Sequence, residues 1–248
     1  FIYLNNNLNH KKFFDSLEQL DYPKNKIIIH ISSLRNNKYI INGYNQLILT
    51  DSDDFNEGDI RKQSFNNCIN LQCEYYLNVD PNVIIEDINL INELLSYDKN
   101  IVCPLFKIKG KNWSNFWGDI NSDGWYNNSY NYYEIINYNH KGCWNVPYIN
   151  NIYLINKNIL QNIQNYYHLN YDEDRGYDMS FCENLRKNNY FMYLCNGSVY
   201  GYLDDLEENN EISIFDYEEN QNEYIQKYFT EEFLETYLNY NNIKEPIN

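Results

Sequence analysis

The turn Asp80-Pro81-Asn82 directly follows the stretch Glu74–Val79, which the sequence predicts to be a strand. In open α/β sheets, ligands bind outside the carboxyl ends of the strands. Asp80 offers a carboxylate there and Asn82 an amide oxygen, and oxygen ligands of this kind hold divalent cations. The alternative is that Asp80 only caps a turn whose backbone Pro81 restricts.

Two other charged residues could act together with this turn. Arg61 opens the predicted helix before the strand, where it could meet a diphosphate or simply face solvent. Asp178 opens a later predicted helix, after Asp172, Glu173 and Asp174. These acids could supply a base or a metal ligand, or they could only complement the helix dipole.

Nucleotide-sugar transferases of the GT-A type carry an Asp-x-Asp motif in a turn of this kind, and its acids hold the cation that neutralises the leaving diphosphate. The first acid, Asp80, is present, but Asn82 replaces the second. A site that loses one carboxylate binds a divalent cation less tightly.

All four tryptophans lie between residues 111 and 148, a long stretch with little periodicity. They could line a groove for a sugar or a peptide, because aromatic faces stack on both. They could equally pack inside an ordered loop. The candidate groove residues are Trp113, Trp117, Trp125 and Trp144.

Other catalytic and metal motifs are missing from the sequence. There is no P-loop, Gly-x-Ser-x-Gly or Gly-x-Gly-x-x-Gly motif, and no His-x-Asp pair for a 2-oxoglutarate iron site. The six cysteines show no zinc-ligand spacing. Cys68 and Cys73 are close enough in sequence to form a local disulfide, although cysteines are also common as buried free thiols.

The composition argues against a nucleic-acid binder and against a membrane-spanning protein. The 248 residues carry a net charge of −16, whereas nucleic-acid binders present a positive face. No apolar run is long enough for a transmembrane helix. Alanine is missing and Asn is abundant, which indicates an AT-rich genome. The chain does not begin with Met, so we expect it to be part of a longer protein.

Alternating apolar runs and amphipathic stretches predict an α/β fold with a mixed, mainly parallel sheet flanked by helices. We expect one domain over residues 1–205 and a C-terminal helical extension over 206–248. The expected strands cover 1–4, 26–33, 44–50, 74–79, 101–106, 148–155 and 190–195, and the expected helices 8–20, 60–71, 86–96, 157–167, 178–187 and 220–240.

Several short segments closely resemble the procollagen lysyl hydroxylase family, in matching order over nearly the whole chain. They include WSNFWG at 113–118, DGWY at 123–126, WNVPY at 144–148 and DMSFC at 178–182. The resemblance is to the central accessory domain, which is GT-A-like. In the family this domain lies between a glycosyltransferase domain and a C-terminal hydroxylase domain that uses Fe²⁺ and 2-oxoglutarate. The AT-rich composition suits a viral member.

The resemblance implies roles for some residues, and it shows that other family positions carry a different residue here. It implies nucleotide-sugar-binding positions at Asp80, Arg61 and Asn82, a weakened metal position at Asp80, and a candidate catalytic role for Asp178. Ser198 stands where the family carries a His. The implied function is an accessory domain that supports hydroxylation and glycosylation of collagen lysines without catalysing either. The alternative is an active UDP-sugar transferase that uses Mn²⁺ and acts on hydroxylysine.

The resemblance also implies partners and a location. The partners are the neighbouring glycosyltransferase and hydroxylase domains of the same polypeptide, a collagen-like substrate and, in the alternative, a UDP-sugar. Fe²⁺ and 2-oxoglutarate are expected only in the hydroxylase domain, which would follow the end of this chain. Family members act in the lumen of the endoplasmic reticulum, and a viral member would act in the host cell or the virion.

Overall fold

The computed structural model describes residues 1–4, 10–33, 41, 43–44, 47–51 and 56–205 of the 248. The helical extension predicted over 206–248 lies outside these residues. Phe1–Asp204 forms one compact unit. None of the described helices is long and apolar enough to cross a bilayer.

The centre of the unit is a mixed sheet built in two parts. The strands β1 (Ile2–Leu4), β2 (Ile29–Ser33) and β3 (Leu47–Asp51) pair in parallel. The other part has the order β10 (Cys143–Val146), β13 (Met192–Cys195), β6 (Ile101–Pro104), β12 (Ile152–Asn156) and β4 (Tyr75–Val79).

Phe1 joins the two parts of the sheet. Its amino group donates to the Leu77 carbonyl at 2.6 Å, and the Val79 amide donates to the Phe1 carbonyl at 3.0 Å. This is the parallel ladder pattern, so β1 continues the sheet beyond β4. Strands β13 and β6 are also parallel, whereas β12 runs antiparallel to both of its neighbours and β10 antiparallel to β13. The predicted mixed α/β sheet is confirmed.

Smaller elements surround this sheet. Three short antiparallel pairs are β5 (Val83–Ile85) with β14 (Gly201–Leu203), β7 (Phe116–Trp117) with β11 (Tyr148–Ile149), and β8 (Asp119–Ile120) with β9 (Tyr126–Asn127). The α-helices are α1 (Lys11–Glu18), α2 (Glu57–Asn70), α3 (Leu90–Ser96), α4 (Tyr132–Ile136), α5 (Lys157–Ile163) and α6 (Gly176–Lys187), and a 3₁₀ turn covers Lys24–Lys26.

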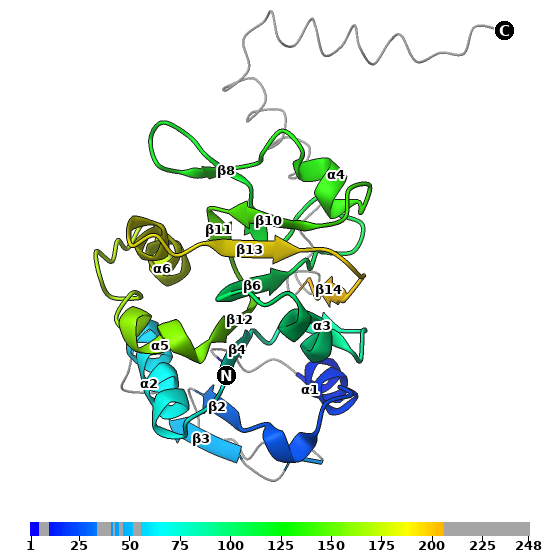
Figure 1. Ribbon diagram of the computed structural model, residues 1–248, viewed down its shortest axis with the longest axis vertical. Helices are drawn as coiled ribbons and strands as arrows, with labels where there is room; N and C mark the ends of the chain where they lie inside the picture. Colours follow the sequence, from blue (N-terminus) through cyan, green and yellow to red (C-terminus); the bar gives the residue numbers. More distant parts are fainter. Residues whose placement is uncertain (5–9, 34–40, 42, 45–46, 52–55, 206–248) are drawn as a thin grey trace, which may run out of the picture. The chain divides into compact units, whose positions relative to one another are not determined.

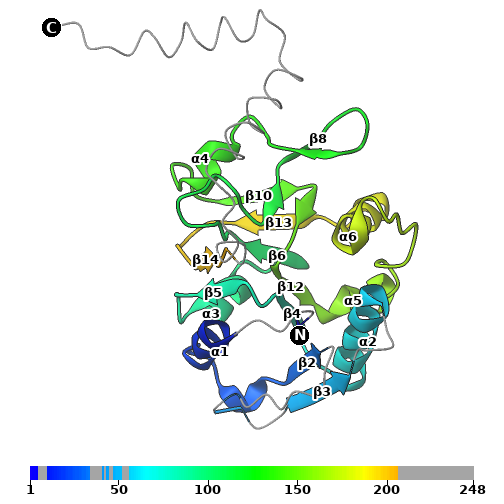
Figure 2. The ribbon, with the colours of Figure 1, turned by 180° about the vertical axis from the view of Figure 1, so that it is seen from behind.

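Helices cover both faces of the sheet. Figures 1 and 2 show α2, α5 and α6 on one side of the strands and α1 and α3 on the other. Successive residues of a strand point to opposite faces. Accordingly, Tyr153 and Ile155 of β12 belong to the hydrophobic cluster under α2, α5 and α6, whereas Ile152 and Leu154 belong to the cluster under α1 and α3.

The strand predicted over 148–155 is wrong in one respect, because it is divided into β11 and β12. Asn151, between them, has a positive φ of 62°. Asn tolerates this left-handed conformation better than most residues, so the chain can turn there. The predicted elements also omit β5, and the ordered loop expected over 111–148 contains short strands and α4.

Of the two alternatives for Cys68 and Cys73, the free thiols hold and the local disulfide does not. Cys68 and Cys73 are free thiols, and the disulfide joins Cys143 to Cys195. These two cysteines face each other directly on β10 and β13, with Cα atoms 4.2 Å apart. Cross-strand register, rather than closeness in sequence, therefore selects the pair. Cys103 and Cys182 are buried free thiols.

We expect the double variant Cys143→Ser/Cys195→Ser to lose about 2–4 kcal/mol of unfolding free energy, because the cross-link restricts the unfolded chain. The cross-linked residues are 52 apart in sequence. Urea unfolding of the two proteins would measure the difference. The control is Cys73→Ser, which removes a free thiol. Equal losses in both variants would contradict the prediction.

Candidate functional site

Helix α2 carries Arg61 into the interior. Its first turn is capped by Asn56, whose side-chain oxygen accepts from the Asp59 amide at 2.9 Å. The acids Glu57 and Asp59 lie near the positive end of the helix dipole. Arg61, one turn further, is only 3% exposed and lies on the same buried face as Phe65. A guanidinium at this depth requires compensating partners.

Carboxylates and an amide provide these partners. The Arg61 Nε and Nη2 atoms donate to Glu57 Oε1 at 3.0 and 2.8 Å, and Nη1 donates to Asn78 Oδ1 at 2.6 Å. The same Nη2 atom lies 3.5 Å from Asp80 Oδ1 and 3.9 Å from Asp178 Oδ1. We call Glu57, Arg61, Asn78, Asp80 and Asp178 the Arg61 cluster.

The turn after β4 is fixed by Asn151. The Asn151 carbonyl accepts from the Asp80 amide at 2.8 Å and from the Asn78 side chain at 3.2 Å. The Asn151 side chain donates to Asn82 Oδ1 at 3.3 Å and lies 3.4 Å from Asp80 Oδ2. The side-chain oxygen of Asn82 therefore already has a protein donor.

Aromatic rings form the inner wall of the cluster. The Arg61 guanidinium lies 5.5 Å from the ring centre of Tyr167 and 5.9 Å from that of Phe1. The Tyr167 hydroxyl is hydrogen-bonded to the Tyr153 hydroxyl. This surrounding excludes water from the guanidinium and lowers the local dielectric, which strengthens charge interactions inside the cluster.

Burial disturbs the acids of the cluster. Desolvation raises the pKa of Asp178 from 3.8 to about 7, against the opposing effect of Arg61, while Glu57 and Asp80 raise it further. Desolvation also raises the pKa of Asp80, and Arg61 partly opposes that shift. Both carboxylates are therefore held more tightly in their neutral form than an exposed acid would be.

The cluster does not fit a divalent cation well. Among the described residues, no group of three or more His, Cys, Asp or Glu side chains is arranged to hold a metal ion. Asp80 and Asp178 do converge, but they converge on the same guanidinium nitrogen. A divalent cation beside this nitrogen would be repelled by its positive charge, and it would have to displace Asn151 from Asn82.

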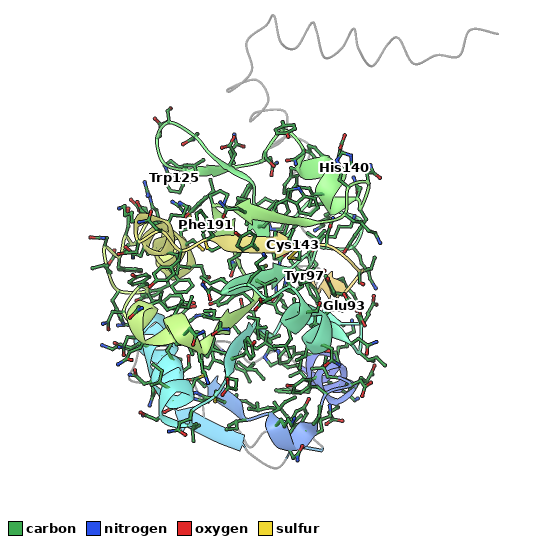
Figure 3. The ribbon with its side chains drawn as sticks, viewed as in Figure 1. Glu93, Tyr97, Trp125, His140, Cys143 and Phe191 are labelled. Carbon is green, nitrogen blue, oxygen red and sulfur yellow. A yellow bond between two sulfur atoms is a disulfide. The ribbon has the colours of Figure 1, made fainter. Side chains whose placement is uncertain are left out.

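The other acids and Ser198 lie elsewhere. Asp172 is near Arg175, 3.7 Å from its Nε, and its side chain accepts from the Asp174 amide. Ser198 donates to Glu93 of α3 at 2.9 Å, and Figure 3 shows Glu93 on that helix. The hydroxyl of Ser198 is thus used away from the Arg61 cluster.

The four tryptophans are distributed over several contacts. Trp113 and Trp117 meet edge to face at 5.3 Å. Trp125 lies 5.4 Å from the Arg175 guanidinium, and Trp144 packs partly buried against the core. Trp113 and Trp125 are 51% and 43% exposed, so they are available at the surface. Their role as groove residues remains a prediction.

The sequence identified three members of the cluster, Arg61, Asp80 and Asp178, and missed Glu57 and Asn78. Glu57 could have been found from its position one helical turn before Arg61, where side chains meet. Asn78 could have been noticed as a polar residue inside an apolar strand. Asn151 lies 71 residues from Asp80 and gave no such signal.

Comparison with known proteins agrees with this architecture. The sequence model of glycosyltransferase family 25, N-terminal domain, matches residues 58–222, which is more than half of the chain. Two solved structures of TarS from S. aureus share the fold at 12% identity. The longer gives a TM-score of 0.52 over 84% of this chain and 37% of that one. The 1–349 structure with UDP-GlcNAc gives 0.51 over 82% and 58%.

Curated relatives are collagen-modifying proteins. The chain is 35% identical to the procollagen lysyl hydroxylase and glycosyltransferase of Acanthamoeba polyphaga mimivirus, over 90% of this chain and 24% of that protein. It is 40% identical to mouse procollagen-lysine,2-oxoglutarate 5-dioxygenase 1, over 54% and 18%. It is 32% identical to human procollagen-lysine,2-oxoglutarate 5-dioxygenase 2, over 77% of this chain and 28% of that protein.

The chain thus spans between 18% and 28% of the length of these relatives. The resemblance seen in the sequence is confirmed, and the fold is GT-A-like. The chain belongs to glycosyltransferase family 25 and is a relative of the procollagen lysyl hydroxylases.

Proposed function

We propose that this glycosyltransferase-like domain is an accessory domain that supports the modification of collagen-type lysines and does not transfer sugar itself. One observation carries the proposal: the guanidinium of Arg61 occupies the space between Asp80 and Asp178, where a transferase of this fold would need a free cation site. The chain supplies its own fixed cation at this point.

Arg61 is also poorly placed to replace the metal in catalysis. A leaving diphosphate needs N–H donors that it can reach. All three nitrogens of Arg61 contact Glu57, Asn78 or Asp80, and the residue is 3% exposed. The cluster is therefore arranged to stabilise the turn after β4 rather than to bind a substrate.

The accessory role extends to partners and location. The mimivirus relative, which carries both activities in its name, is about four times longer than this chain, so we infer that neighbouring hydroxylase and glycosyltransferase domains are its partners. Its net charge of −16 would attract a lysine-rich, collagen-like substrate. The Cys143–Cys195 disulfide favours a compartment that permits disulfides, such as the endoplasmic reticulum lumen.

One observation favours a second function, a Mn²⁺-dependent transfer from a UDP-sugar. Asp80 and Asp178 lie within 4.0 Å of the same nitrogen, so two carboxylates do meet beside the turn. Asp178, whose pKa is about 7, would then be the candidate base. This function requires Arg61 to move out of the cluster when donor and metal bind.

Calorimetry with UDP-glucose and UDP-galactose, with and without Mn²⁺, separates the two functions. We expect no Mn²⁺-dependent binding at millimolar donor concentrations. Mn²⁺-dependent binding that is lost in Asp80→Ala, and kept in the exposed control Asp123→Ala, would overturn the accessory role. Circular dichroism of both variants would confirm that a loss of binding is not a loss of folding.

A further inference from the structure

Arg186 lies in the last turn of α6, on the side of the molecule that carries β8 and β10. One nitrogen, Nη1, donates to the Tyr126 hydroxyl at 2.5 Å and to the Pro147 carbonyl at 2.7 Å. Its guanidinium also lies 5.0 Å from the ring centre of Tyr126. One edge of the guanidinium is therefore held in place by neutral groups.

No carboxylate of the described residues lies within ion-pair distance of Arg186. The other described arginines differ in this respect, because Arg61 contacts three acids and Arg175 lies near Asp172 and Glu183. Glu183, one turn before Arg186, lies 2.9 Å from Lys187 and 3.5 Å from Arg175. A half-buried guanidinium without a counter-charge is unusual in a chain with a net charge of −16.

Arg186 also lines a pocket. Its Nε and Nη2 atoms donate no hydrogen bond to another described residue. The pocket has a volume of about 380 Å³. Pockets of roughly 300–1,000 Å³ are typical of sites for small ligands. Tyr126 and the helix end offer only partial negative charges, and no carboxylate of the described residues pairs with Arg186 beside this pocket.

The walls of the pocket combine apolar surface with amide groups. Phe191, immediately before β13, is 59% exposed, and Tyr190 precedes it. Figure 3 shows Phe191 beside β13, on the α6 side. Asn145 and Asn189 add amide groups, and Asp119 contributes a single carboxylate. That carboxylate accepts from the Ile120 amide at 2.8 Å.

We propose that this pocket binds a carboxylate carried on an apolar body. The planar N–H edge formed by Nε and Nη2 matches the two oxygens of a carboxylate, which it can bind in a bidentate manner. Phe191 and Tyr190 would cover the apolar part, and the amides of Asn145 and Asn189 would surround the rim. The ligand is either a free aryl or alkyl carboxylic acid or the C-terminal carboxylate of a peptide that ends in an apolar residue.

Titration of the ¹⁵N-labelled 248-residue chain by NMR tests the proposal, with 3-phenylpropionate as the first probe. We expect saturable shifts of the Val146 and Phe191 amides, and binding at least about tenfold weaker for the neutral 3-phenylpropanamide. Acetyl-Leu-Phe with a free C-terminus, compared with its C-terminal amide, distinguishes a peptide source from a free acid. Equal binding of the acid and amide forms, or no saturable shifts, would overturn the proposal.

Two rim variants keep the test independent of folding, since neither removes a contact of Arg186. Asn145→Asp adds a negative charge to the pocket and should weaken binding of the acid about threefold. Asp119→Asn removes one and should strengthen it about threefold, while its oxygen can still accept from Ile120. Arg186→Gln should weaken binding at least about tenfold. Rim variants that change affinity equally, or in the same direction, would contradict the proposal.

Discussion

Replacing Arg61 with Met is expected to lower the unfolding free energy by about 3–5 kcal/mol at pH 8, because removing one partner of a buried ion pair leaves the other charge uncompensated. Here three carboxylates, those of Glu57, Asp80 and Asp178, lie within 4.0 Å of the guanidinium. Without it they would face one another as like charges in a partly buried space. Urea unfolding, followed by tryptophan fluorescence, measures the loss.

The matched control is Arg175→Met. Arg175 also lies near two acids, Asp172 and Glu183, but it is more exposed than Arg61. The Arg175 side chain is 23% exposed against 3% for Arg61, and ion pairs nearer to solvent contribute less, so this variant should lose less than Arg61→Met. The double variant Arg61→Met/Asp178→Asn should recover part of the loss, because it removes one of the repelling charges. If Arg61→Met loses no more stability than Arg175→Met, the three carboxylates of the cluster do not depend on the Arg61 charge, and the prediction is wrong.

This result also bears on the proposed function. If the guanidinium stabilises the fold by several kcal/mol, then moving it aside to admit a divalent cation would cost a similar free energy. A transferase that depends on Mn²⁺ would have to recover that cost from the binding of metal and donor. The stability measurement and the calorimetry therefore test one arrangement of charges in two independent ways.

Local sequence predicted the part of the site that local structure controls. Arg61 lies one turn into α2, the helix before β4, and Asp80 directly follows that strand, so their meeting follows from a helix packed on its own neighbouring strand. Asp178 joins them from the start of α6. That contact depends on how distant elements dock, and the sequence indicated Asp178 only as an acid at a helix start and through its match to the family.

The remaining contacts depend on pairings that no local pattern specifies. Asn151 reaches Asp80 because β12 inserts antiparallel between β4 and β6. The same is true of the disulfide. Cys143 and Cys195 are opposite each other only because β10 pairs with β13, whereas the possible Cys68–Cys73 disulfide rested on sequence distance alone. In both cases the pairing of distant strands determines which Asn or Cys residues come into contact, and the local sequence does not.

Asp178 should give the cluster a measurable pH dependence. Its pKa is raised from 3.8 to about 7 in the folded protein, mainly by desolvation, so the folded state holds this proton more tightly than the unfolded state does. The stability that follows from this proton is fully present below about pH 4 and is lost as the pH rises through about 7. Ionised Asp178 is thus a destabilising group at alkaline pH.

We therefore expect Asp178→Asn to match the wild type in stability near pH 4 and to exceed it at pH 8. The shift from 3.8 to about 7 corresponds to an upper value of about 4 kcal/mol. Asn keeps the shape of the protonated acid but cannot ionise, so Arg61 then has one fewer competing charge nearby. The control is Asp172→Asn, at a half-exposed acid outside the cluster. A wild type that gains stability over Asp178→Asn as the pH rises from 4 to 8 would show that Arg61 outweighs desolvation, and that Asp178 is a firmly ionised partner of the guanidinium.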